Sequence, residues 1–145
     1  PHLLSRLTHY GIEPEWLEIE ITEEAILSNK VFLIRTMEAM QAKGIRIDID
    51  DFGTGYASFP HLLKYPFDKI KLDRSLLLDA TDQKGRDLYE LVAKLGRITH
   101  CEVVAEGVET QQEYDFVKGC GVDKVQGYFF ARPAPLKDII AEQSI

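Results

Sequence analysis

Apolar and polar residues largely alternate, one by one, along five short segments of the chain. Residues 17–22 are an example, because every odd position is apolar and every even position is polar. Side chains of a β-strand point to opposite faces in turn, so this period of two predicts strands with one apolar and one polar face. The five predicted strands are residues 17–22, 45–50, 69–73, 102–106 and 124–129.

Longer segments with helical spacing separate these strands. Apolar residues at Leu27, Val31, Ile34 and Met37 predict a helix over residues 24–43, which Gly44 ends. Connections of this length exclude hairpins, so we expect parallel strands joined by right-handed crossovers and an α/β fold. The other predicted helical segments are residues 61–64, a region after residue 73 with a turn at 81–85 and a helix over 87–100, then 110–118 and 136–142.

The polar face of the predicted strands is unusual for a parallel sheet. Both faces of such a sheet are normally covered, so its strands usually read as apolar throughout. If helices cover the apolar face, the polar face must line an interior, and a (β/α) barrel offers one with an active site at its C-terminal mouth. We therefore predict an incomplete TIM-like (β/α) barrel of about five parallel strands. Five strands cannot close an eight-stranded barrel, so the first and last would be open edges.

Acidic residues gather toward the carboxyl ends of the predicted strands. Carboxylates held close together repel one another, so they must take up protons or hold a cation. Oxygen ligands without His or Cys suit Mg²⁺, Mn²⁺ or Ca²⁺ and not zinc. A carboxylate shared by two cations about 3.5–4 Å apart would create a two-metal site for phosphoester chemistry. The residues expected to converge are Glu20, Asp50, Asp51, Asp73 and Glu106.

Two neighbouring polar residues admit several roles. Lys71 could anchor a phosphate or the attacking water, or it could be a countercharge in buried ion pairs with the carboxylates. Gln126 could orient a substrate or a water molecule. The loop at residues 53–55, Gly-Thr-Gly, follows the Asp pair and would let the backbone bend closely round a ligand.

Length and charge narrow the range of partners. The 145 residues suit one domain or a piece of one, and the net charge of −7 argues against binding a nucleic acid polymer or a membrane surface. No apolar run approaches the ~20 residues of a membrane-spanning helix, and residues 1–4 lack the features of a signal peptide. Because the chain begins without Met, we expect a fragment or a processed product.

The remaining residues invite ordinary interpretations. Cys101 and Cys120 are expected to be reduced thiols of a cytosolic protein. We interpret Trp16 as a core residue and Glu18 as surface charge.

Five motifs together resemble the second half of an EAL domain, the bacterial cyclic-di-GMP phosphodiesterase. The resemblance runs from about Leu3 to Pro135, and it implies a (β/α)₈-type barrel that hydrolyses cyclic-di-GMP to linear pGpG with Mg²⁺ or Mn²⁺. In chain order, the motifs are Glu20-Ile21-Thr22-Glu23, Asp50-Asp51-Phe52-Gly53-Thr54-Gly55-Tyr56, Lys71-Leu72-Asp73-Arg74-Ser75, Val104-Ala105-Glu106-Gly107-Val108-Glu109-Thr110 and Gln126-Gly127-Tyr128.

The resemblance also implies roles for single residues. Glu20 and Asp50 would bind one metal ion, and Asp50 would bridge to a second ion held by Asp51 and Glu106. Lys71 would contact the nucleophilic water. The residues expected to support the substrate or the loops are Gln126, Glu23, Asp73 and Glu109, with Glu23 bracing the loop at residues 51–58, which in this family also shapes dimerisation.

Departures from the family pattern bear on what the chain can do. Ala57, Phe59 and Leu76 are mild replacements. The Glu-Ala-Leu motif that names the family, and the asparagine after it, are absent from these residues. We therefore expect residues 1–145 to be the C-terminal portion of a single EAL domain whose N-terminal barrel strands lie outside this chain.

Three functions remain open from the sequence. The parent protein could be a cytoplasmic bacterial cyclic-di-GMP phosphodiesterase, either alone or as part of a larger multidomain sensor. The chain could instead be a non-catalytic module that binds cyclic-di-GMP or a protein partner. A different metal-dependent phosphoesterase on a similar barrel is the third alternative. The open edges predict either that barrel strands from outside this chain cover them or that copies of this chain associate. We expect the former for the natural protein, and a homodimer or other self-association for this chain.

Overall fold

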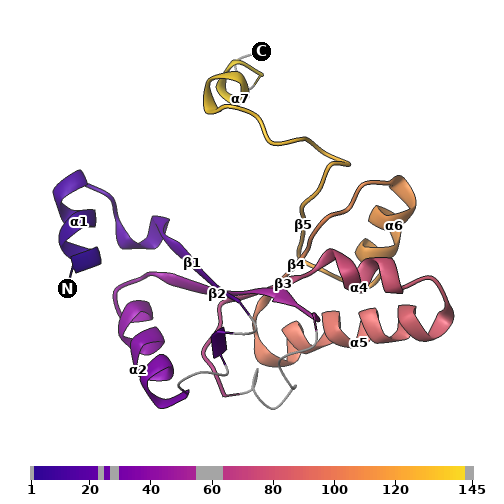
Figure 1. Ribbon diagram of the computed structural model, residues 1–145, viewed down its shortest axis with the longest axis horizontal. Helices are drawn as coiled ribbons and strands as arrows, with labels where there is room; N and C mark the ends of the chain where they lie inside the picture. The colour runs from indigo at the N-terminus through magenta and orange to yellow at the C-terminus, as the bar shows by residue number, and fades with distance from the viewer. Residues whose placement is uncertain (1, 23–24, 27–29, 55–63, 143–145) are drawn as a thin grey trace.

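The computed structural model describes residues 2–22, 25–26, 30–54 and 64–142. Its centre is a five-stranded parallel sheet in the order β1-β2-β3-β4-β5, which confirms the predicted α/β fold (Figure 1). Sequential strands are neighbours throughout, and β1 and β5 are the two edges of this sheet. The strands are β1 (Glu18–Thr22), β2 (Arg46–Phe52), β3 (Lys69–Leu72), β4 (Glu102–Ala105) and β5 (Lys124–Val125).

Helices cover one face of the sheet. Figure 1 shows α2 and α5 on the same side of the strands, whereas α7 stands away from the sheet at the end of an extended segment. No helix in the described ranges combines the length and the apolar character that crossing a bilayer requires. The helices are α1 (His2–Tyr10), α2 (Lys30–Gln41), α4 (Arg74–Asp79), α5 (Gln83–Thr99), α6 (Gln111–Gly119) and α7 (Leu136–Glu142), with a short 3₁₀ turn at Pro14–Trp16.

The hydrophobic core lies between these helices and the apolar strand face. Burying this face removes much apolar surface from water, which is the main stabilising contribution to a fold of this kind. The predicted alternation holds along β3 and along β2 as far as Asp50, with the apolar parity facing the helices, and Phe52 joins the core after the bulge at the end of β2. The core residues of the strands are Ile47, Ile49, Ile70, Leu72, Val103 and Ala105, and they pack with helix residues that include Met37, Tyr89, Val92 and Ala93.

Helix α5 approaches the sheet unusually closely at Gly96. A Cβ atom added at Gly96 would lie 1.9 Å from the Cγ2 atom of Val103 on β4. The helix starts at Gln83, earlier than predicted, because the carboxylate of Asp82 accepts a hydrogen bond from the backbone N–H of Gly85 and caps it. It ends at Thr99, and the next residue, His100, caps it with a left-handed φ of 59°.

The last predicted strand is wrong beyond its second residue. Strand β5 ends at Val125, although the backbone N–H of Gln126 still donates to the carbonyl of Ala105 at 2.8 Å. At Gly127 the chain passes so close to Val108 that a Cβ would lie 2.0 Å from its carbonyl oxygen. The chain then turns, and the N–H of Phe130 donates to the Gly127 carbonyl at 3.1 Å. Glycine at position 127 permits this close contact of two backbones, and the strand ends just before it.

Other expectations differ at the edges of the fold. Helix α1 was not predicted, although its leucines at positions 3, 4 and 7 have helical spacing. Trp16 is 75% exposed, so its interpretation as a core residue is wrong. The predicted start of a helix at residue 24 and residues 61–63 of the short predicted helix lie outside the described residues.

Candidate active site

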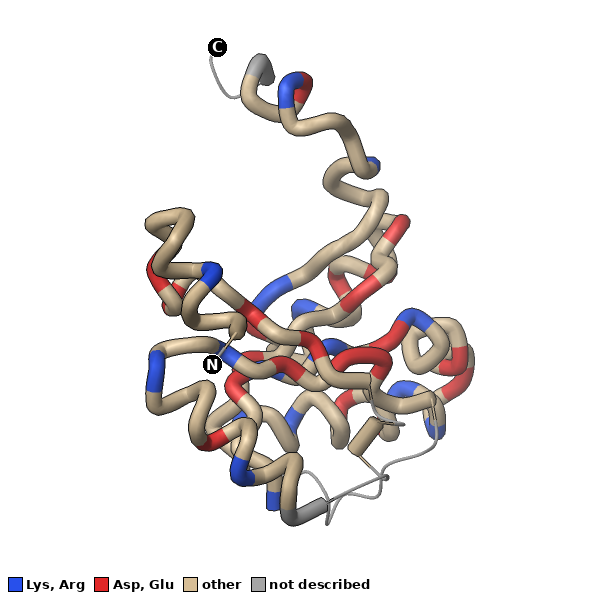
Figure 2. The backbone as a smooth tube through the Cα atoms, turned by 60° about the vertical axis from the view of Figure 1, so that its left-hand side comes forward, with Lys and Arg blue, Asp and Glu red and all other residues tan. Residues whose placement is uncertain are grey.

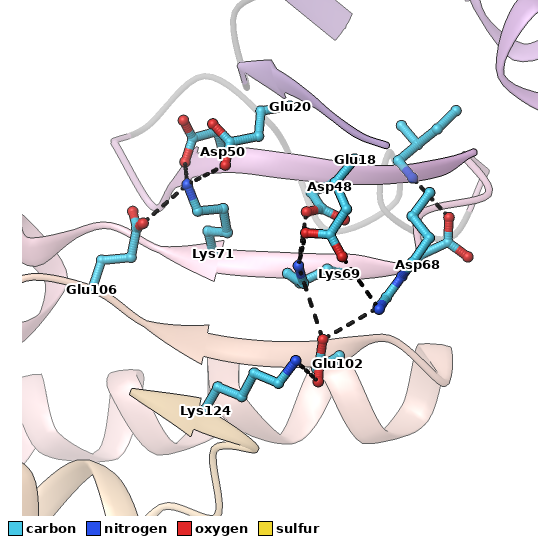
Figure 3. A network of polar contacts seen from close by, with 12 residues as sticks. Glu18, Glu20, Asp48, Asp50, Asp68, Lys69, Lys71, Glu102, Glu106 and Lys124 are labelled. Carbon is cyan, nitrogen blue, oxygen red and sulfur yellow. Dashed lines mark hydrogen bonds and ion pairs between the residues drawn. The ribbon is translucent and has the colours of Figure 1, made fainter. Parts of the chain in front are cut away.

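Lys71 lies at the centre of an acidic group on the polar face of the sheet. Its ammonium Nζ lies 2.8 Å from Glu20 Oε1, 2.9 Å from Asp50 Oδ1 and 3.0 Å from Glu106 Oε1 (Figure 3). These carboxylates come from β1, β2 and the residue after β4, and Lys71 itself comes from β3, so four neighbouring chain segments contribute to one site. Figure 2 shows that several acidic segments of the chain, in red, lie close to one another near the centre of the fold. The prediction that these residues converge is therefore confirmed for this group.

A bulge at the end of β2 brings in the adjacent carboxylate. Ile49 pairs with Ile70, but the next pair in register is Phe52 with Leu72. Strand β2 therefore contains one more residue than β3 between these two pairs. Asp51 adopts a left-handed φ of 53° there. A bulge re-aims side chains that strict alternation would place on opposite faces. Asp50 and Asp51 can thus serve the same site although they are neighbours in sequence.

Three carboxylates form a group that can hold a divalent cation. One oxygen each from Asp50, Asp51 and Glu106 lies within 4.8 Å of the others. Oxygen donors at this spacing suit hard divalent cations, which take carboxylate ligands. The donor set therefore fits the metal ion that the sequence predicts. Glu20 is not part of this group of three. In Figure 3 it lies on the far side of Lys71 from Glu106, and it contacts the Lys71 ammonium, which also contacts Asp50 and Glu106.

The ionisation of the central residues follows from their burial. Burial raises the pKa of Glu106, and the nearby Lys71 ammonium opposes this only in part. Burial would lower the pKa of Lys71, but its hydrogen bonds to Glu20, Asp50 and Glu106 outweigh burial and raise it. Lys71 is therefore an ammonium ion at neutral pH. Lys71 is thus the countercharge to these carboxylates, which is one of the roles expected for it from the sequence.

The supporting residues occupy three different positions. Asp73 does not join the carboxylate group, because its side chain accepts a hydrogen bond from the Ser75 N–H at 2.9 Å and caps α4. Glu109 forms an ion pair with Arg74. The side chain of Gln126 is exposed, and Glu23 lies outside the described residues.

A second layer of charges lies nearer the amino ends of the same strands, and the sequence analysis did not predict it. It consists of Glu18, Arg46, Asp48, Lys69, Glu102 and Lys124. Lys69 Nζ lies 2.5 Å from Glu18 Oε2 and 3.0 Å from Asp48 Oδ2 (Figure 3). Asp48 is only 1% exposed, and its Oδ1 has no hydrogen-bond partner among the described residues. Glu18, interpreted as surface charge, thus belongs to an ion-pair network. The signal was available, since Glu18, Asp48 and Lys69 all fall on the polar parity of their strands.

The rest of this second layer consists of Glu102 and two cations that pair with it. The carboxylate of Glu102 forms ion pairs with Arg46, whose Nη2 lies 3.2 Å from Oε2, and with Lys124, whose Nζ lies 2.8 Å from Oε1. The pKa of Glu102 is lowered, first by its hydrogen bond from Lys124. The pKa of Glu18 is likewise lowered, first by the hydrogen bond from Lys69. Each acid of this layer therefore has a cation beside it, in contrast to the site around Lys71, where three acids share one lysine.

Both cysteines are free thiols, as predicted. Cys120 is buried and Cys101 is half-buried. Burial raises the pKa of each thiol, so neither is an activated nucleophile.

Comparison with known proteins identifies the family. The family model described as EAL domain matches residues 1–133. The cyclic di-GMP phosphodiesterase NbdA of Pseudomonas aeruginosa is 38% identical over 131 residues, which are 90% of this chain and 17% of NbdA. The chain thus spans less than a fifth of that relative.

Solved structures share the fold. The PaMucR phosphodiesterase in complex with c-di-GMP is 32% identical with a TM-score of 0.86, and the match covers 93% of this chain and 55% of that one. BlrP1 of Klebsiella pneumoniae, in a complex with manganese and cyclic-di-GMP, is 31% identical with a TM-score of 0.83 over 91% of this chain and 34% of that one. Since the family model also covers every strand on which the acidic site is built, the chain belongs to the EAL domain family.

Proposed function

We propose that the protein containing this chain hydrolyses one phosphodiester bond of cyclic-di-GMP to give linear pGpG, with Mg²⁺ or Mn²⁺ as cofactor. The observation that carries this proposal is the group formed by Asp50, Asp51 and Glu106 beside the Lys71 ammonium. The similarity to phosphodiesterases that bind cyclic-di-GMP supports the choice of substrate. The chain would supply the C-terminal portion of a single EAL domain, with the other barrel strands outside it.

The carboxylates divide between two cation positions in this proposal. Glu20 and Asp50 would hold one ion, and Asp50 would bridge to a second ion held by Asp51 and Glu106. Bound cations would neutralise phosphate charge and lower the pKa of a bound water. The bulge at Asp51 supports this division, because it lets two successive residues offer oxygens to one site.

Lys71 would act as a hydrogen-bond donor and not as a base. Its contacts with Glu20, Asp50 and Glu106 hold its pKa above the ordinary value of a lysine, so it keeps its proton at neutral pH. An ammonium in this place can donate to the attacking water or to a phosphate oxygen. Gln126, Glu23, Asp73 and Glu109 would support the substrate or the loops around it.

Self-association is part of the same proposal. Strands β1 and β5 are open edges within the described sheet, and an unpaired parallel edge invites another strand. We therefore expect a homodimer, or pairing with barrel strands from outside this chain. The family resemblance and the free thiols support a bacterial cytoplasmic protein.

The decisive experiment follows the linear product. The protein is incubated with cyclic-di-GMP and either Mg²⁺ or Mn²⁺, and pGpG is measured by chromatography. Asp50→Asn should abolish product formation, whereas Asp115→Asn, an exposed aspartate on α6, should leave it unchanged. Binding of cyclic-di-GMP without hydrolysis would instead favour the non-catalytic module.

A further inference from the structure

Arg74 connects the start of α4 to the loop that follows β4, beside the cation site. It is the first residue of α4, and the cap formed by Asp73 fixes its backbone. Its Nη1 donates a hydrogen bond of 2.6 Å to the carbonyl oxygen of Gly107 and also contacts the carboxylate of Glu109. One guanidinium therefore holds two points of the loop that follows β4.

The aliphatic part of the Arg74 side chain also packs closely against this loop, at Gly107. Gly107 has a left-handed φ of 68°, and a Cβ atom there would lie 2.7 Å from Arg74 Cβ and 2.8 Å from its Cγ and Cδ. A larger residue at position 107 would push the loop after β4 away from the start of α4. Glycine thus permits the contact on which the hydrogen bond to Arg74 depends.

The opposite side of the same loop is also anchored. The N–H of Val108 donates to the carbonyl of Gln126 at 3.2 Å. The N–H groups of Glu109 and Thr110 both donate to the Glu113 carboxylate, at 2.8 and 2.9 Å, at the start of α6. The loop is therefore clamped between Arg74 and the chain that follows it.

Glu106 stands directly before this clamped loop. Its carboxylate belongs to the group with Asp50 and Asp51, and its backbone N–H donates to the carbonyl of Leu72 at 3.1 Å. That bond fixes the backbone of Glu106 on one side only. The Arg74 bond to the Gly107 carbonyl holds the peptide between Gly107 and Val108, one peptide beyond the one that follows Glu106, and so restricts the path by which the chain leaves Glu106.

We propose that Arg74 is a positioning residue that holds Glu106 in the cation site through the carbonyl of Gly107. The inference deepens the proposed function and rests on it for the identity of the cation. Arginine suits this task because its guanidinium can donate to a carbonyl and a carboxylate together, whereas a lysine has a single nitrogen on a flexible stem. Groups that orient a metal ligand typically change metal affinity 10–100-fold when removed.

The test measures Mn²⁺ affinity by calorimetry, separately from hydrolysis. Arg74→Ala should weaken Mn²⁺ binding about 10–100-fold. Arg74→Lys should cause an intermediate fall, and this variant decides the question if the alanine variant does not fold. Arg97→Ala is the matched control, since Arg97 also donates to a backbone carbonyl, that of Cys120 at 3.5 Å. It should leave Mn²⁺ affinity unchanged.

Two results would overturn the proposal. The first is equal Mn²⁺ affinity in the Arg74 variants and the unmodified protein, or a loss that Arg97→Ala reproduces. The second is a raised KM for cyclic-di-GMP at saturating Mn²⁺ with unchanged Mn²⁺ affinity, which would place Arg74 on the substrate. If the unmodified protein binds Mn²⁺ but forms no pGpG, the proposed function fails while the affinity comparison still decides the role of Arg74.

Discussion

Asp50 and Asp51 offer oxygens to the same cation site although they are consecutive residues of one strand. Strict alternation would send their side chains to opposite faces of the sheet. The extra residue of β2 and the left-handed φ of 53° at Asp51 remove that alternation at the point where the site forms. The geometry of the site therefore depends on a local backbone conformation as well as on charge.

This dependence predicts different outcomes for two substitutions of Asp51. Asparagine tolerates left-handed φ, whereas valine is branched at Cβ, so Asp51→Val should destabilise the protein by about 1–2 kcal/mol relative to Asp51→Asn. Both variants should lose Mn²⁺ affinity, because both lack the carboxylate. Urea unfolding and Mn²⁺ titration measure the two effects. Equal stability of the two variants would show that the bulge carries no strain.

The sequence predicted those parts of the site that follow from the alternation of polar and apolar residues along the strands. Glu20, Asp50 and Lys71 fall on the polar parity of their strands, and pairing between parallel neighbours brings them together. Asp51 falls on the opposite parity, so the alternation itself gave no reason to place it beside Asp50. Its position at the end of the strand led to the expectation that it converges with the others, and its role as a metal ligand came from the family resemblance. The bulge that brings it to the site depends on pairing with a distant strand, which no local pattern reveals.

The end of β5 illustrates the same limit. Residues 124–129 alternate well enough to predict a strand, yet the structure turns after Val125. The cause is the approach of Gly127 to the backbone of Val108, nearly twenty residues away along the chain. The second layer of charges differs, because its parity was visible, and only the pairing of Glu18 with Lys69 required the structure.

Close packing of α5 on β4 predicts a coupled pair of substitutions. Gly96→Ala should destabilise the protein although alanine favours helices, because its Cβ would lie 1.9 Å from Val103 Cγ2. In a Val103→Ala background that clash disappears, so the same change should cost far less. A double-mutant cycle by urea denaturation should give an interaction energy of about 0.5–3 kcal/mol. Additive effects would contradict the close approach.

Acid sensitivity should have a measurable contribution from Glu102. Its folded-state pKa lies below the ordinary value of 4.5, mainly because Lys124 donates a hydrogen bond to its carboxylate. The unfolded chain therefore binds its proton first as the pH falls, so the stabilisation exists above about pH 4.5 and is lost as the pH falls through the folded-state pKa.

The comparison variant is Glu102→Gln, which keeps the shape and removes the charge. The difference in unfolding free energy between the unmodified protein and this variant should be largest near neutral pH and should shrink steadily below pH 4.5. Gln111→Glu, on the exposed surface of α6, provides a charge control whose effect should lack this dependence on Lys124. A difference that grows toward low pH would contradict the assigned sign.

The buried pair of Lys69 and Asp48 predicts that one substitution costs more than two. Burial raises the pKa of Asp48, which shows that its charge is unfavourably placed and depends on Lys69. Lys69→Met removes the ammonium 3.0 Å from this carboxylate and should destabilise the protein by about 3–5 kcal/mol. Combining it with Asp48→Leu removes the uncompensated charge as well, so much of that stability should return. Arg46 and Lys124 still pair with Glu102 in both variants. Urea unfolding of the three proteins measures the effect, and a double variant no more stable than Lys69→Met would mean that the pair is not the cause.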